Sequence, residues 1–270
     1  MDFILIQNNQ KYYKVPAIGL EWKTLGLKPY IANKDIVEQN QFKEFYLHEQ
    51  DFIKYSNSIM KATHPKDNNK MIVACLGIES ILIRVKVEGF SPEILTMYQL
   101  VMSQIKMIYF DANFKDYLKI LECSPRVKYY LLRAVICKTL AHKMGWTSKK
   151  IQDDILMAAL FCDLGSEMEH NPGLYHAEYL ADVMSLNIKI SDAVTQGIKH
   201  HHEFNDGTGP LKLSRFQINP VAKLIRTVEE ALDMLYKKQD LHQLLPIQFK
   251  NKLDANIVDS CLEIFKNKRI

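Results

Sequence analysis

The sequence lacks the cysteine pattern of a disulfide-stapled or zinc-ribbon protein. It has five cysteines, an odd number, at wide spacing and without a CxxC pair: Cys75, Cys123, Cys137, Cys162 and Cys261. Such a set is neither a disulfide framework nor a zinc knuckle. We therefore expect free thiols in a protein of the cell interior.

Long apolar runs are missing as well. The most apolar stretch, MIVACLGIESILIRVKV at 71–87, carries Glu79 and Arg84 and is too short and too charged to span a bilayer. The first residues, MDFILIQNNQKYYK, place no basic segment ahead of a long apolar run, so we do not expect a signal peptide. A cytoplasmic protein without membrane contact is the expectation.

The sequence also lacks a strong excess of one charge. Its 35 Lys and Arg against 31 Asp and Glu leave a net charge of +4, and the lysines are scattered rather than grouped. The basic end KNKRI is short, and GTG at 207–209 is too short for a glycine-rich phosphate loop. We therefore expect no nucleic-acid partner.

What remains is an ordinary globular composition, 47% apolar and 24% charged over 270 residues. Short apolar runs between turn residues predict a small mixed α/β domain at 1–62. Residues 63–119 are expected to form a linker, clearest in THPKDNNK at 63–70, and connecting helices. Residues 120–270 carry helical periodicity throughout. The predicted fold class is mainly α, with a helical C-terminal bundle after the small α/β domain.

Capping signals predict where several helices begin. Ser91-Pro92-Glu93 opens a run that we expect to continue to about Phe114, and Ser124-Pro125 opens another that ends near Gly145. Thr147 is the expected cap of the next helix. Further helices are expected at 173–186, 191–203, 218–236 and 247–267.

Helix phase places several histidines toward the core. His176 lies on the same helix face as apolar residues at i+3, i+4 and i+7. His201 continues an apolar stripe of the following helix, His202 lies at the edge of that stripe, and His200 points away. A single inward histidine is usually a hydrogen-bonded core residue, so this pattern alone leaves both interpretations open.

Two carboxylates share this orientation. Asp163 ends the apolar segment MAALFCD, and Glu229 borders an apolar stripe from which Glu230 points away. Burying several polar or charged side chains in one core costs free energy unless they pair with each other or bind metal. Imidazole and carboxylate suit iron, manganese, zinc or nickel. These groups favour a divalent metal site, with these candidate ligands: Asp163, His176, His201, His202 and Glu229.

In order and spacing, four segments resemble the HD-GYP domain, a bacterial branch of the HD phosphohydrolases that hydrolyses cyclic di-GMP. They are MGWTSKKIQDDILMAALFCDLG, HAEYLADVM, HHEFNDGTGP and NPVAKLIRTVEEALDML, all within residues 120–236. The resemblance implies a helical metal-dependent phosphodiesterase domain. It implies that Asp163 would be the catalytic bridging carboxylate if the site is active.

The chain departs from the family pattern at several positions. The His-Asp pair is Cys162-Asp163, and no histidine stands near Tyr129 or Tyr130 on the upstream helix. Ser166 replaces the usual lysine, and GTGP lacks the aromatic residue of GYP. The connection from Asp163 to His176 is also shorter than usual. The second metal position would thus lose its histidines, and the resemblance implies one divalent metal ion or none.

Two functions follow from these residues. The first is a catalytically impaired HD-GYP signalling or interaction module with a partial metal site, a protein partner and a cyclic dinucleotide as candidate ligand. The alternative is an active metal-dependent phosphodiesterase of cyclic di-GMP or a related phosphodiester with an altered site. A homodimer is compatible with both. If Asp163 cannot share an ion with His201 and His202, the enzyme hypothesis fails.

Overall fold

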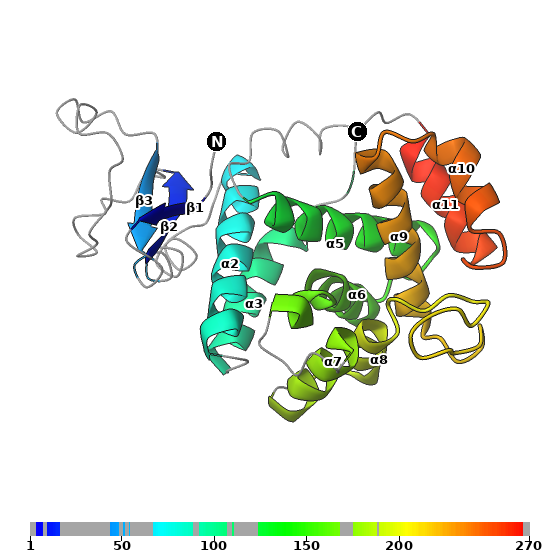
Figure 1. The fold of residues 1–270 in the computed structure, drawn as a ribbon, viewed down its shortest axis with the longest axis horizontal. Helices are drawn as coiled ribbons and strands as arrows, with labels where there is room; N and C mark the ends of the chain where they lie inside the picture. Colours follow the sequence, from blue (N-terminus) through cyan, green and yellow to red (C-terminus); the bar gives the residue numbers. More distant parts are fainter. Residues whose placement is uncertain are drawn as a thin grey trace.

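The chain is described by a computed structural model, and most of its described residues are helical (Figure 1). The described residues are 4–7, 10–16, 44–48, 51, 54, 67–88, 92–106, 110, 124–167, 175–187 and 189–266. A small sheet precedes the helices, which confirms the predicted fold class. The predicted domain boundaries near residues 62 and 119 lie outside the described residues, and so do Ser91, Phe114 and Cys123.

The sheet contains the three strands β1 (Ile4–Gln7), β2 (Gln10–Pro16) and β3 (Glu44–His48). It is antiparallel, with the order β1-β2-β3. Ile4 pairs with Tyr13 across the first ladder, and Tyr12 pairs with His48 across the second. In Figure 1 the sheet lies apart from the helical part, on the side of α2.

Two helices, α2 (Asp67–Glu88) and α3 (Pro92–Ile105), pack against each other and form one side of the helical part. The apolar run at 71–87 is the middle of α2. The predicted linker at 63–70 is corrected here, because α2 already begins at Asp67. Among the described residues, no helix combines the length and the hydropathy that a bilayer crossing requires.

The centre of the helical part is α5 (Pro125–Lys143), which packs on α6 (Lys149–Phe161) and α9 (Pro220–Tyr236). The side chain of Ser124 accepts a hydrogen bond from the Val127 amide at 3.3 Å and caps α5, as the sequence predicts. Every residue of 130–138 is buried. A charged side chain in this stretch must therefore find its partners inside the protein.

Shorter helices surround this centre. After α6 come the 3-10 turn η2 (Leu164–Glu167), α7 (His176–Asn187) and α8 (Asp192–Lys199). The last two described helices are α10 (Leu241–Gln248) and α11 (Ala255–Phe265). Both α7 and α8 lie on the α6 side in Figure 1, and α10 and α11 lie beyond α9.

Three helix predictions need correction. Ser148, not Thr147, caps α6, because its side chain accepts from the Ile151 amide. The helix expected at 191–203 stops at Lys199, so the histidines that follow lie beyond it. The helix expected at 247–267 begins only at Ala255, because α10 ends at Gln248, the chain turns at Asn251, with φ +67°, and Asp254 caps α11.

Candidate metal centre

The ends of several helices bring the predicted ligands to one place. Asp163 follows directly after α6, and His176 is the first residue of α7. His201 and His202 follow α8, and Glu229 lies on the inner face of α9. Gly165 keeps α7 close to this point, because a Cβ there would collide with the backbone oxygen of His176.

The first group of donors contains one carboxylate and three imidazoles. One ligand atom from each of Asp163, His176, His201 and His202 lies within 4.8 Å of the others. The Oδ1 atom of Asp163 lies 3.3 Å from Nε2 of His201 and 3.8 Å from Nε2 of His176. Nε2 of His202 lies 3.2 Å from Nε2 of His176. Asp163 and the two adjacent histidines can therefore share an ion.

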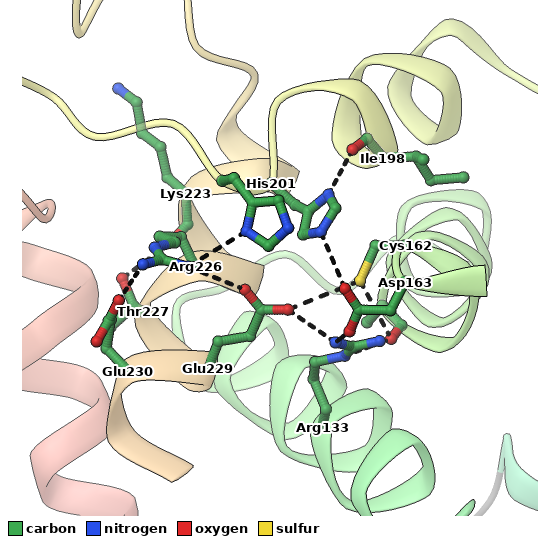
Figure 2. A network of polar contacts seen from close by, with 12 residues as sticks. Arg133, Cys162, Asp163, Ile198, His201, Lys223, Arg226, Thr227, Glu229 and Glu230 are labelled. Carbon is green, nitrogen blue, oxygen red and sulfur yellow. Dashed lines mark hydrogen bonds and ion pairs between the residues drawn. The ribbon is translucent and has the colours of Figure 1, made fainter. Parts of the chain in front are cut away.

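His201 has the orientation of a metal-binding histidine. Its side chain is fully buried, and its Nδ1 lies 2.6 Å from the carbonyl oxygen of Ile198 (Figure 2). A carbonyl only accepts, so Nδ1 carries the proton and donates it. The other nitrogen, Nε2, is the one left for an ion, and it faces Oδ1 of Asp163. A backbone carbonyl that fixes the tautomer in this way is the usual outer partner of a ligating histidine.

A second group of donors overlaps the first. Ligand atoms of Cys162, Asp163, His201 and Glu229 also lie within 4.8 Å of one another. Two members, Asp163 and His201, belong to both groups. The chain therefore offers two neighbouring donor sets, and the second set has one histidine, a thiol and two carboxylates.

A buried arginine on α5 contacts the second group. The Nη1 atom of Arg133 donates to Glu229 Oε1 at 2.7 Å and to Oδ2 of Asp163 (Figure 2). Its Nε donates to the carbonyl oxygen of Ala159 at 2.8 Å. The guanidinium carbon lies 5.5 Å and 5.1 Å from the ring centres of Tyr129 and Tyr130. The arginine is thus held by two carboxylates, a carbonyl and two aromatic rings.

The charges of the buried groups follow from this contact. Burial by itself raises the pKa of Asp163, but Arg133 and His201 outweigh it and hold the pKa well below its usual range. Burial raises the pKa of Glu229 even though Arg133 lowers it. Burial also raises the pKa of the Cys162 thiol well above its usual range, again against Arg133. An ion at Cys162 would therefore have to displace the thiol proton, because the thiolate is the form that binds metal.

His202 lies on the other side of the first group. Burial, with help from the nearby His201, lowers the pKa of His202 to about 3, so the ring is neutral at pH 7. Neutral imidazole is the form that binds metal. Nη1 of Arg226 lies 3.4 Å from Nδ1 of His202, and Nη2 of Arg226 donates to Glu230. Glu230 is thereby held outside the site, as its helix phase predicts.

Several buried polar atoms around the site have no hydrogen-bond partner among the described residues. They are Arg133 Nη2, Tyr175 Oη, Arg226 Nε and Glu229 Oε2; the last of these lies 3.6 Å from Nη1 of Arg226, as an ion pair without a hydrogen bond. Buried polar atoms are normally satisfied, so a cluster of exceptions needs an explanation. Two of these atoms donate, one accepts and one can do either. Together with the tautomer of His201, these atoms fit a site that is completed by an ion and water or a polar ligand.

The remaining polar residues of HHHEFNDGTGP lie outside the two donor groups. His200 accepts a hydrogen bond from the Asn219 amide at 3.3 Å. Glu203 accepts from the Leu211 and Leu213 amides at 2.7 Å and 2.9 Å and folds the loop back. Asp206 accepts from Thr208 within a turn. The sequence did not assign the loop-closing role of Glu203.

Arg133 and Arg226 are the functional candidates that the sequence analysis missed. Arg133 is the one charge within the apolar run YYLLRAVIC at 129–137. A charge in a run with no polar face is a signal of a buried partner. The interpretation of this helix looked for a histidine at Tyr129 or Tyr130, and the structure places a cation one turn later instead.

Comparison with known proteins supports the fold. No protein-family model and no curated protein sequence matches this chain. Among solved structures, the chain is similar to Bd1817, a HDG"Y"P protein from Bdellovibrio bacteriovorus, with a TM-score of 0.65. The match covers 98% of this chain and 95% of the other, at 15% sequence identity. The chain has the HD-GYP fold. At this identity the similarity concerns the fold alone, and the metal role of the ligands stays a prediction.

Proposed function

We propose that this chain is a catalytically impaired HD-GYP-type signalling or interaction module that binds one divalent metal ion. One observation carries the proposal: the two oxygens of Asp163 have different partners. Oδ1 faces His201 and His176, whereas Oδ2 accepts from Arg133. Asp163 therefore serves one ion with its histidines, and its other oxygen is occupied by a cation of the protein.

The single ion would be held by the first donor group. Three imidazoles and one carboxylate suit Fe²⁺, Mn²⁺, Zn²⁺ or Ni²⁺. Such an ion, when bound, polarises a phosphate oxygen and lowers the pKa of a bound water. The residues of the chain fix the ligands: the carbonyl of Ile198 orients His201, and the contact with Arg133 keeps Asp163 ionised.

The second donor group supports the impairment. Efficient phosphodiesterases of this kind use a carboxylate that bridges two ions. Here Oδ2 of Asp163 and the carboxylate of Glu229 both accept from Arg133, and burial raises the pKa of the Cys162 thiol well above its usual range. The lysine position is Ser166, whose hydroxyl donates to the backbone of Asp163 at 2.7 Å. Ser166 therefore supplies no positive charge for a substrate phosphate, which a lysine at this position would.

A cyclic dinucleotide is the small ligand that this proposal favours, with a signalling protein as partner and the cytoplasm as location. The guanidinium of Arg226, which lies beside His202 and is 18% exposed, is suited to phosphate oxygens. The alternative is the active phosphodiesterase. The observation that favours it is the first donor group, in which Asp163, His176, His201 and His202 still converge. A site that had lost its activity would not be expected to keep all four ligands in place.

Hydrolysis of cyclic di-GMP separates the two functions. Wild type, Asp163→Asn and the exposed control Asp192→Asn are incubated with substrate and Mn²⁺ or Fe²⁺ beside a phosphodiesterase of known activity. We expect no turnover by wild type above the level of Asp163→Asn. Wild-type turnover that Asp192→Asn keeps and Asp163→Asn abolishes would establish the enzyme and overturn the impaired module.

A further inference from the structure

The two donor groups differ in their relation to the charges of the protein itself. Both carboxylates of the second group accept from the same atom, Nη1 of Arg133. In the first group, Arg133 contacts only Asp163, on the oxygen that faces away from the histidines. A positive charge therefore already lies in the second group.

An ion and the guanidinium cannot share these oxygens. A divalent transition metal binds carboxylate oxygen at about 2.0–2.2 Å. Nη1 of Arg133 lies 2.7 Å from Glu229 Oε1 and also contacts Asp163 Oδ2. An ion bound to the same two oxygens would lie in direct contact with Nη1, and two positive centres would repel each other without water between them.

Arg133 cannot easily move away. Its side chain is fully buried, and its Nε donates to the Ala159 carbonyl. The faces of Tyr129 and Tyr130 lie against the guanidinium. Every residue around it on α5 is packed in the core. The arginine is thus part of the rigid interior and not a flexible side chain that an incoming ion displaces.

We propose that Arg133 is a built-in cation that takes the place of a second metal ion, so that the chain binds one ion and a neutral residue at 133 admits two. This inference rests on the proposed single-metal site. The replacement explains how Asp163 and Glu229 stay buried without a second ion. It also explains a loss of chemistry, because a guanidinium neutralises carboxylates but carries no coordinated water to activate.

The test measures bound Mn²⁺ per folded chain by equilibrium dialysis and elemental analysis, with far-UV circular dichroism to establish folding. Arg133→Gln removes the charge, and Arg133→Lys keeps it on a slimmer side chain. We expect one equivalent for wild type and Arg133→Lys and two for Arg133→Gln. The two ions of Arg133→Gln should be exchange-coupled in electron paramagnetic resonance, because Asp163 belongs to both donor groups and has two oxygens to offer.

The failures of the two proposals give different results. One equivalent in folded Arg133→Gln, with one in wild type, overturns the role of Arg133 and leaves the single-metal site standing. No Mn²⁺ in wild type overturns the single-metal site itself. Two equivalents in wild type or in Arg133→Lys show that the arginine does not exclude an ion, whether or not Arg133→Gln folds.

Discussion

Replacing Arg133 by methionine is expected to lower the free energy of unfolding by about 3–5 kcal/mol, the usual cost of removing one partner of a buried ion pair. Asp163 and Glu229 would lose their shared donor while Glu229 stays only 5% exposed. The measurement is urea unfolding with a chelator present, so that every variant is compared without metal. This is the largest stability effect that the site predicts.

Two further variants identify the cause of that loss. Arg215→Met removes an exposed arginine and should change stability by less than about 0.5 kcal/mol. Arg133→Met combined with Glu229→Gln removes one charge of each sign and should recover a substantial part of the loss. A loss in Arg133→Met no larger than that of Arg215→Met would show that the arginine does not stabilise the carboxylates.

The second large effect concerns the adjacent histidines. His202→Ala is expected to weaken Mn²⁺ or Zn²⁺ binding by more than about 100-fold, beyond the 10–100-fold that changes behind the ligands produce. His200→Ala is the matched control, because His200 contacts Asn219 and lies outside the first donor group. His202 is preferred to His201 for this test because the fully buried His201 also bonds to Ile198. Competition with a coloured chelator measures the affinities.

Comparison of His202→Ala with His200→Ala also detects adventitious binding, since three consecutive histidines bind transition metals on their own. If His200→Ala weakens binding as much as His202→Ala does, the metal is held by the HHH run and not by the convergent site. If neither change weakens binding, the ligand assignment is wrong.

Local signals predicted much of the fold. Ser124-Pro125 opens a helix as expected, because an N-cap hydroxyl and a proline at the first position act within one turn. The inward direction of His201 and the outward direction of Glu230 follow from the apolar stripes beside them. The phase of a stripe fixes which side faces the core, even where the helix of His201 proved to end at Lys199.

The partner of Asp163 was not predictable in the same way. Arg133 lies 30 positions before Asp163 and 96 before Glu229. Only the packing of α5, α6 and α9 brings these three side chains together. The sequence shows that no histidine stands near Tyr129 or Tyr130 on the upstream helix. It does not show that the site has gained a cation, because that depends on contacts between distant segments.

The division of the C-terminal helices was missed for a related reason. Apolar residues with helical spacing lie on both sides of residues 249–254, so the pattern favoured a single helix at 247–267. The break depends on Asn251 in a left-handed conformation and on the Asp254 side chain, which accepts from the Asn256 amide at 3.1 Å. A polar NKLD segment was too short to outweigh the periodicity around it.

The metal content of the wild-type chain tests the central claim most directly. The protein should be purified anaerobically without a histidine tag, incubated with iron and manganese, and measured by elemental analysis after removal of the excess. One equivalent per chain is the predicted result, with Asp163, His176, His201 and His202 as ligands. Two equivalents, or none, would contradict a site that holds one metal ion and one arginine.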